Sequence, residues 1–139
     1  MGTENTLKIF LVDDDSFCRS TYRQFLANKG CSDIQEFGSG PDCLDHLYQQ
    51  PDIIFLDHGM DPLTGLDVLK KLRISNPDAY VVFISGQANI TTAVKALKLG
   101  AIDYIAKGVN ELENIANVLD TITPLIIKRN IKRMLVSQS

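Results

Sequence analysis

The sequence predicts a doubly wound α/β protein, in which a five-stranded parallel sheet carries helices on both faces. Two observations support this prediction. Short apolar runs typical of fully buried strands occur five times, and a stretch with helical periodicity follows each of them. Right-handed crossovers between parallel strands place such helices on both sides of the sheet. A length of 139 residues with 45% hydrophobic content fits one domain with a sizeable core.

The expected elements follow one another in a regular order. Glycine- and proline-containing loops separate them, as turns between strands and helices require. The predicted strands cover residues 7–12, 33–37, 52–56, 80–85 and 101–106. Each predicted helix has an apolar stripe at helical spacing. In chain order the stripes contain Cys18, Tyr22 and Phe25; Leu44, Leu47 and Tyr48; Leu66, Leu69 and Leu72; Ile90, Ala93, Val94 and Leu97; and Leu112, Ile115, Ala116 and Leu119.

Composition and charge exclude several classes of protein. The formal net charge of -3 gives no general attraction to nucleic acid or to an anionic membrane. No apolar run approaches the roughly 20 residues that cross a bilayer, and the N-terminus has no apolar signal region. Cys18, Cys31 and Cys43 lack metal-ligand spacing and are interpreted as small core residues. We therefore expect a cytoplasmic protein with reduced thiols that is not embedded in a membrane.

Polar side chains that can bind ions or take part in reactions stand at the ends of four predicted strands. Asp13 and Asp14 follow the first strand, and Asp57 follows the third. Ser85 ends the fourth strand, and Lys107 follows the fifth. Because the carboxyl ends of parallel strands meet at one edge of the sheet, we expect these groups to lie close together. Carboxylate oxygens suit Mg²⁺, while a hydroxyl and an ammonium group suit an incoming phosphoryl group.

The spaced set VDDD, LDHGM, ISG and DYIAKG, with Gly65 eight residues after Asp57, resembles the receiver domain of bacterial two-component response regulators. The resemblance covers roughly residues 7–122 and implies a CheY-like, flavodoxin-like (βα)5 fold with strand order 2-1-3-4-5. It implies a receiver domain over residues 1–123 that is a signalling phosphoacceptor and not an enzyme, since it assists only its own phosphorylation and dephosphorylation. The implied partners are a sensor histidine kinase or phosphotransfer protein, and a second copy through the fourth helix, fifth strand and fifth helix.

The resemblance also implies a role for each site residue. Asp57 would accept the phosphoryl group. Asp13, Asp14 and Asp57, with the main-chain carbonyl of Gly59, would hold Mg²⁺, and Mn²⁺ would suit the same oxygen ligands. The implied phosphoryl-binding residues are His58, Gly59, Ser85, Gly86 and Lys107, and the implied switch residues are Ser85 and Tyr104.

The chain departs from the family pattern in its loops. Gly108 stands where the family usually has a proline in a cis peptide after the lysine. A cis peptide before glycine costs roughly 2.5–4 kcal/mol, so we expect a trans or a strained peptide there. Asp61 occupies the usual proline position after Asp57 and Pro62 follows it, while Gly59 lacks the side chain that often shields the acyl phosphate. These departures concern loop geometry and phosphoryl lifetime rather than the chemistry itself.

Other interpretations of these residues stay open. The aspartates 13–15 suit the first turn of the following helix, and Asp15 by itself fits an N-cap better than a metal ligand. A pseudo-receiver, a binding module that is not phosphorylated, would share the fold, and Mg²⁺-dependent phosphorylation discriminates between the two. A haloacid-dehalogenase-like phosphatase also has an aspartate nucleophile after its first strand. Phe17 stands where that family has Thr or Val, and turnover of a phosphate ester tests this alternative.

The residues from 124 to 139 are expected to form an amphipathic helical extension or the start of a linker. Pro124 is predicted to interrupt the fifth helix, because proline removes a hydrogen bond and clashes with the preceding turn. Ile127, Ile131 and Met134 then form an apolar seam among basic residues. The seam suits a partner helix, self-association or packing on the domain itself. No helix-turn-helix fits in this stretch, so we expect no direct nucleic-acid contact; whether an output domain belongs to the protein stays open.

Overall fold

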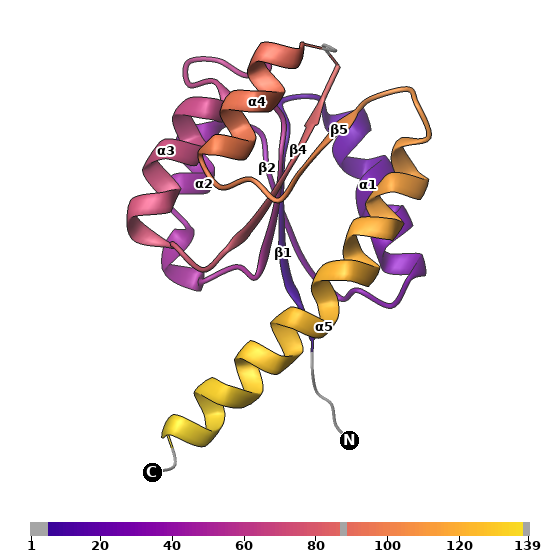
Figure 1. The fold of residues 1–139 in the computed structure, drawn as a ribbon. Coiled ribbons are helices and arrows are strands. Elements are labelled where there is room, and N and C mark those ends of the chain that lie inside the picture. Colours follow the sequence, from indigo (N-terminus) through magenta and orange to yellow (C-terminus); the bar gives the residue numbers. More distant parts are fainter. Residues whose placement is uncertain (1–5, 87–88, 138–139) are drawn as a thin grey trace.

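A parallel five-stranded sheet forms the centre of the computed structural model, which describes residues 6–86 and 89–137 (Figure 1). The strand order is β2-β1-β3-β4-β5, and every neighbouring pair is parallel. The predicted fold class and strand order are therefore confirmed. The strands are β1 (Lys8–Val12), β2 (Asp33–Phe37), β3 (Ile53–Leu56), β4 (Tyr80–Ser85) and β5 (Asp103–Ala106).

Helices cover both faces of the sheet, as Figure 1 shows. Helices α1 and α5 pack on one face, and α2, α3 and α4 pack on the other. Crossovers of one hand produce this arrangement when the strand order reverses beside β1. The helices are α1 (Ser16–Asn28), α2 (Gly40–Leu44), α3 (Gly65–Ser75), α4 (Ile90–Lys98) and α5 (Glu111–Ser137), with a short 3-10 helix over Leu47–Gln49.

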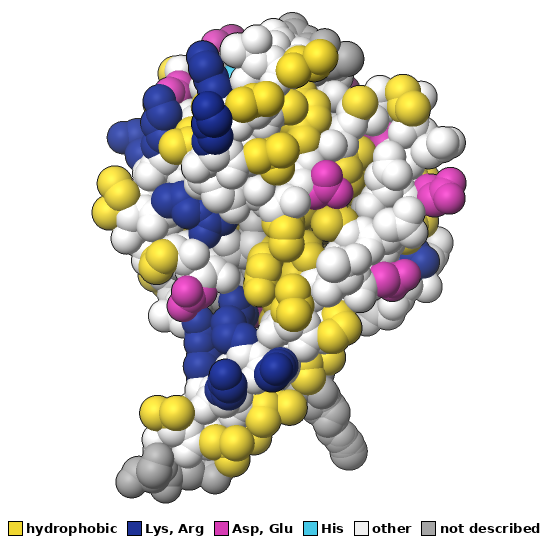
Figure 2. Space-filling model, viewed as in Figure 1, with side chains coloured by type: hydrophobic (Ala, Val, Ile, Leu, Met, Phe, Trp, Pro, Cys, Tyr) yellow, Lys and Arg dark blue, Asp and Glu magenta, His cyan; other side chains and the backbone are white. Residues whose placement is uncertain are grey.

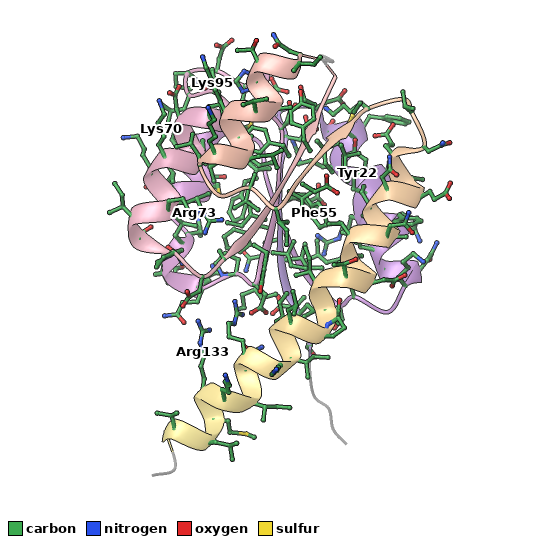
Figure 3. The ribbon with its side chains drawn as sticks, in the orientation of Figure 1. Tyr22, Phe55, Lys70, Arg73, Lys95 and Arg133 are labelled. Atoms are coloured by element: carbon green, nitrogen blue, oxygen red, sulfur yellow. The ribbon has the colours of Figure 1, made fainter. Side chains whose placement is uncertain are left out.

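The central strands are apolar on both faces because both faces are covered. In β1, Ile9 and Leu11 belong to the core cluster under α1 and α5, whereas Phe10 and Val12 belong to the cluster under α2, α3 and α4. Successive side chains of a strand point to opposite faces, so a strand buried on both sides reads as one continuous apolar run. Phe55 of β3 lies near the middle of the molecule (Figure 3), at the centre of this two-sided core.

Side-chain caps fix where two of the helices begin. Asp15 accepts hydrogen bonds from the N–H groups of Phe17 (2.9 Å) and Cys18 (3.3 Å), which confirms the predicted N-cap of α1. Thr64 and Asp67 form a capping box at the start of α3, with the Asp67 N–H 3.3 Å from the Thr64 hydroxyl. Both caps lie in the loops that follow the carboxyl ends of β1 and β3, and they hold these loops in place.

The prediction that Pro124 interrupts the fifth helix is wrong. Helix α5 continues through Pro124 to Ser137 and projects beyond the sheet (Figure 1). Ile122 and Ile126, on either side of the proline, are both fully buried. Their burial compensates for the backbone hydrogen bond that the proline lacks, so tertiary packing overrides the local preference. No described helix is both long enough and apolar enough to cross a membrane.

Three smaller expectations also need correction. The second helix is shorter than its apolar stripe suggests, and Tyr48 is exposed in the 3-10 helix. Of the cysteines, only Cys43 is buried, whereas Cys18 and Cys31 are partly exposed at the edge of the core. The apolar stripe of α4 faces solvent in part, because small Ala96 is the buried residue of this helix. Its larger members Ile90, Val94 and Leu97 are exposed.

Candidate phosphoryl-acceptor site

Three carboxylates meet where β1 and β3 end. Asp13, Asp14 and Asp57 each offer an oxygen, and these oxygens lie within 4.8 Å of one another. The pairing of β1 with β3 produces this proximity: Val12 is in register with Leu56, and the N–H of Asp57 donates to the carbonyl of Val12 at 2.9 Å. Asp13 and Asp57 are only 4% and 7% exposed, whereas Asp14 faces solvent. The structure thus brings the predicted acidic residues together.

Lys107 bridges the two buried carboxylates. Its Nζ donates to Asp13 Oδ2 at 2.8 Å and lies 3.7 Å from Asp57 Oδ1. Strand pairing positions it, since the backbone N–H of Lys107 donates to the carbonyl of Ser85 at 2.9 Å. Burial alone would lower the pKa of this ammonium group, but the Asp13 hydrogen bond and the two carboxylate charges raise the pKa overall. Lys107 is therefore a fixed positive charge in the site.

The surroundings of Asp57 disfavour ionisation of its carboxyl group. Burial raises the pKa of its carboxyl, and the neighbouring charge of Asp13 raises it further. Lys107 and a hydrogen bond from the N–H of Gly59 oppose this shift without cancelling it. A cation that binds the carboxylates would relieve this repulsion, so the electrostatics of the site favour metal binding.

The neighbouring aspartates have separate structural roles. Asp13 uses one oxygen for Lys107 and the other to accept the N–H of Asp15 at 2.9 Å. Asp15 turns away as the N-cap of α1, and its hydrogen bonds from Cys18 and Phe17 lower the pKa of its carboxyl. Asp14 does not cap α1, and its side chain is exposed beside the cluster. Of the three adjacent aspartates, only Asp13 and Asp14 therefore belong to the carboxylate cluster with Asp57.

The donor set fits a small hard cation. Three carboxylates from the described residues converge, and oxygen ligands of this kind suit Mg²⁺ or Mn²⁺. Mg²⁺ keeps several water ligands, which the exposed side of Asp14 leaves room for. Gly59 is exposed next to this cluster, and a Cβ built on it would still be 4.0 Å from Asp57 Oδ2. The entrance to Asp57 is therefore open on this side.

A glycine is needed at position 65 because α3 begins directly against the backbone of the loop that follows β3. A Cβ at Gly65 would lie 2.7 Å from the carbonyl oxygen of Asp57 and 2.8 Å from the Cα of His58. The N–H of Gly65 donates to the carbonyl of His58 at 3.0 Å. The predicted spacing of eight residues between Asp57 and Gly65 thus brings Gly65 back against the start of the loop after β3. The capping box of Thr64 and Asp67 was not predicted, although its T-x-x-D pattern is a recognisable sequence signal.

Three rings lie on the α4 side of the sheet below the site. The His58 and Phe83 ring centroids are 6.3 Å apart, and those of Phe83 and Tyr104 are 6.2 Å apart in a stacked arrangement. Ser85, at the end of β4, is 2% exposed and lies two residues beyond Phe83, so it faces the same side. The structure therefore places Tyr104 and Ser85 on one face, while the buried Nδ1 of His58 has no hydrogen-bond partner.

The loop after Lys107 is shaped by contacts that sequence reasoning did not find. Among the described residues a cis peptide occurs only at Asp61–Pro62, so the peptide between Lys107 and Gly108 is trans, which is one of the two alternatives left open by the sequence. Gly108 has a φ of +84°, a left-handed conformation that glycine tolerates, and its N–H donates to Glu111 at 2.9 Å. Gly86 is exposed opposite this loop, where its Cβ would meet the Lys107 Cδ at 3.9 Å.

Comparisons with known proteins agree with this geometry. The family model of the response regulator receiver domain matches residues 9–119. The regulatory protein LuxO of Vibrio vulnificus (strain YJ016) is 36% identical over 98 residues, which make up 70% of this chain and 21% of LuxO. The chain thus spans about a fifth of the length of this relative.

Solved structures show the same fold. A CheY-like receiver domain protein from Methanospirillum hungatei JF-1 superposes with a TM-score of 0.81 at 21% identity, covering 89% of this chain and 98% of that one. A response regulator from Burkholderia pseudomallei superposes with a TM-score of 0.74 at 26% identity, covering 89% and 72%. That structure contains a phosphorylated aspartic acid, a calcium ion and citrate.

A doubly wound sheet with carboxylates and a lysine at its carboxyl edge defines a CheY-like signalling module. The chain belongs to the response regulator receiver domain family of two-component systems. The receiver domains of this family act as signalling modules that interact with histidine kinases or phosphotransfer proteins.

Proposed function

We propose that Asp57 accepts a phosphoryl group from a sensor histidine kinase or a phosphotransfer protein in a reaction that depends on Mg²⁺. One observation carries the proposal: Asp57 is buried among carboxylates that suit a divalent cation, and the ammonium group of Lys107 lies 3.7 Å from its Oδ1. The phosphorylated aspartate in the similar regulator from Burkholderia pseudomallei supports the same role for Asp57.

The transfer uses few protein groups. A carboxylate oxygen of Asp57 forms a bond to phosphorus while the bond from phosphorus to the donor histidine nitrogen breaks, and the nitrogen keeps that electron pair. Lys107 offsets charge on the phosphoryl oxygens. We assign the remaining hydrogen bonds to the Ser85 hydroxyl and to the backbone around His58, Gly59 and Gly86, which stand at the same edge.

Asp13, Asp14, Asp57 and the main-chain carbonyl of Gly59 would hold the metal ion. When bound, Mg²⁺ supplies positive charge that balances the incoming phosphoryl oxygens, and Mn²⁺ would do the same. Because Gly59 has no side chain, water would reach an acyl phosphate on Asp57 from this side. We propose that the protein assists only its own phosphorylation and dephosphorylation. We propose that it acts on no other substrate and is therefore not an enzyme. We also propose that it signals in the cytoplasm.

The phosphoryl group would be read through Ser85 and Tyr104, which share the α4 face of the sheet. A change at these residues alters the surface of α4, β5 and α5, where a partner or a second copy would dock. The exposed apolar side chains of α4 support a docking role for this surface. The exposed Phe17, close to Asp14 at the start of α1, offers apolar contact to a phosphodonor protein.

Incubation with acetyl phosphate and Mg²⁺, followed by whole-protein mass spectrometry, tests the proposal. We expect one added phosphoryl group that hydroxylamine removes, as an acyl phosphate requires. Asp57→Asn should abolish the addition, and chelation of Mg²⁺ should suppress it in the wild type. Failure of the wild type to gain the group would favour the pseudo-receiver, whereas repeated turnover of a phosphate ester would favour the phosphatase.

A further inference from the structure

Glu111, the first residue of α5, connects helix α1 with the loop that follows Lys107. Its Oε2 accepts a hydrogen bond from the Tyr22 hydroxyl of α1, and its Oε1 accepts the N–H of Gly108 at 2.9 Å. Gly108 comes directly after Lys107 in the chain. Both carboxylate oxygens of Glu111 are therefore engaged, one toward α1 and the other toward the loop that carries the lysine.

Glu111 is held by hydrogen bonds rather than by an ion pair. In Figure 2 most basic side chains gather over α3, α4 and the C-terminal half of α5, away from the first turns of α5. None of the ion pairs among the described residues includes Glu111. Hydrogen bonds require a particular direction, which an exposed ion pair does not, so these two contacts fix where the carboxylate lies.

Tyr22 gives Glu111 a rigid support. The side chain of Tyr22 is 4% exposed and belongs to the core cluster that also contains Ile115 of α5. In Figure 3 Tyr22 lies on the side of α1 that faces the first turns of α5. Burial raises the pKa of its hydroxyl, and the hydrogen bond to Glu111 raises it further, so the hydroxyl stays protonated and remains a donor. A buried ring thus anchors a carboxylate that is itself partly exposed.

The backbone of Lys107 is held on both sides. Its own N–H donates to the carbonyl of Ser85 at 2.9 Å, and the N–H of Gly108 donates to Glu111. Beyond this point the chain turns through Gly108 and Asn110, with φ values of +84° and +51°. Each peptide unit is planar, so the two hydrogen bonds fix the peptide planes before and after Lys107. They thereby fix the direction in which the lysine side chain leaves the backbone.

The same contacts link the two ends of the ion pair between Asp13 and Lys107. Asp13 follows β1 and Lys107 follows β5, and in the sheet β3 and β4 lie between these two strands. The ion pair spans this separation, with the Lys107 Nζ 2.8 Å from Asp13 Oδ2. The contacts of Tyr22, Glu111 and Gly108 span it a second time, from α1 to the loop after β5. Loss of this second link would let the loop move relative to both buried carboxylates.

We propose that Glu111, supported by Tyr22, is a positioning residue for phosphoryl transfer that keeps the ammonium group of Lys107 directed at Asp57. This group lies 3.7 Å from Asp57 Oδ1, so a small rotation of the following peptide would take it away from the acceptor. Glu111 acts indirectly, since its carboxylate contacts α1 and the loop and no reacting atom. Its effect on rate rests on the proposed function, whereas the position of Lys107 is measurable without phosphorylation.

Amine labelling of the metal-free full chain measures how Lys107 is held. Brief treatment with acetic anhydride modifies accessible, unprotonated amines, and peptide mass spectrometry gives the rate at each lysine. In the wild type we expect Lys107 to react more slowly than exposed Lys70, because Lys107 is partly buried and paired with Asp13. Glu111→Ala should bring the Lys107 rate toward the Lys70 rate.

Three further variants separate the hydrogen bonds from charge and from stability. Glu111→Gln keeps a side-chain oxygen that can accept the Gly108 N–H, so Lys107 should stay slow. Glu113→Ala removes an exposed carboxylate from the same first turn of α5 and should leave the Lys107 rate unchanged. Tyr22→Phe keeps the buried ring and removes only the hydroxyl, so it should give an intermediate rate. Melting temperatures show that each variant is folded.

Phosphorylation by acetyl phosphate and Mg²⁺ measures the consequence for Asp57. Glu111→Ala should slow incorporation roughly tenfold, since a small displacement of an aligned group has a large effect on rate. Glu111→Gln should recover most of the rate, and Glu113→Ala should match the wild type. Because Glu111 acts through Lys107, the double variant of Glu111→Ala with Lys107→Ala should be no slower than Lys107→Ala alone.

An unchanged Lys107 labelling rate in folded Glu111→Ala would overturn the proposal. So would equal phosphorylation rates in Glu111→Ala and Glu113→Ala, or losses from the Glu111 and Lys107 substitutions that multiply in the double variant. Tyr22→Phe provides the same comparisons where Glu111→Ala does not fold. A wild type that gains no phosphoryl group would contradict the proposed function, while the labelling rates would still decide whether Glu111 holds Lys107.

Discussion

At the scale of single residues, Asp57 combines reactivity with a cost to stability. The residue is buried, and both burial and the charge of Asp13 raise the pKa of its carboxyl. Lys107 offsets part of this cost through a contact of 3.7 Å. An ionised carboxylate kept in such a place destabilises the metal-free protein, and this leads to a pH-dependent prediction.

Asp57→Asn should stabilise the metal-free protein at neutral pH. Because the folded-state pKa of Asp57 is raised, its contribution to stability is lost as pH rises from the usual value of 3.8 through the raised value. The variant should therefore match the wild type in strong acid and exceed it at neutral pH. Melting temperatures measured across this range in a chelating buffer check the prediction. A variant that is less stable than the wild type at neutral pH would contradict it.

Gly65→Ala should destabilise the protein by about 2–4 kcal/mol, since the new Cβ would lie within 3 Å of two backbone atoms in the loop that follows β3. Gly59→Ala is the matched control, because its Cβ meets nothing closer than 4.0 Å. Neither glycine has a positive φ, so the comparison isolates crowding from backbone strain. Urea denaturation should separate the two variants clearly, and equal stabilities would show that the loop moves freely.

The sequence predicts much of the candidate site at this scale, and the reason is local. Asp13, Asp57 and Lys107 each follow a strand that is recognisable from its apolar run, and parallel strands bring their ends together. The position of His58 beside Phe83 was not predictable, because it depends on how a loop side chain rotates. The cap role of Asp15 was predictable, since cap residues have a strong local preference.

At the scale of secondary-structure elements, the C-terminal half of α5 depends on contacts distant in sequence. Pro124 has a local preference against the helix interior, yet burial of Ile126 and the pairing of Arg129 with Asp52 keep the helix continuous. The two members of this pair are 77 residues apart, and no local signal links them. This explains why the strands were predicted correctly and the course of α5 was not.

Arg129→Ala should destabilise the protein by roughly 2–4 kcal/mol. The side chains of Arg129 and Asp52 are 19% and 12% exposed, so removing the guanidinium leaves a largely buried carboxylate without its cation. Arg133→Ala is the control, because its pair with Asp78 is 49% and 69% exposed and should contribute less than about 1 kcal/mol. Denaturant unfolding of both variants gives the comparison. Equal losses would mean that the Asp52 pair does not anchor α5.

At the scale of the whole molecule, metal binding should be linked to folding. The carboxylate cluster exists only when β1 and β3 pair, so Mg²⁺ would bind the folded state alone. At a hundredfold excess over its dissociation constant, the ion should stabilise the protein by about 2.7 kcal/mol. Thermal unfolding with and without Mg²⁺ measures this directly.

Two neighbouring aspartates provide a sharp control for this linkage. Asp14→Asn should raise metal-free stability slightly, because the Asp14 charge raises the pKa of Asp57, and it should blunt the response to Mg²⁺. Asp15→Asn should keep the full response, since Asp15 caps α1 and asparagine caps equally well. A normal Mg²⁺ response in the Asp14 variant would remove that residue from the ligand set.

The central claim, that Asp57 is the phosphoryl acceptor, is tested most directly by locating the modified residue. Borohydride reduces an acyl phosphate on aspartate to the alcohol, so phosphorylation leaves a permanent mass change at the acceptor. After treatment with acetyl phosphate, Mg²⁺ and borohydride, peptide mass spectrometry should place homoserine at position 57, with Asp13 and Asp14 unchanged. Homoserine at position 13 or 14, or an unmodified Asp57 in a protein that has gained a phosphoryl group, would contradict the claim.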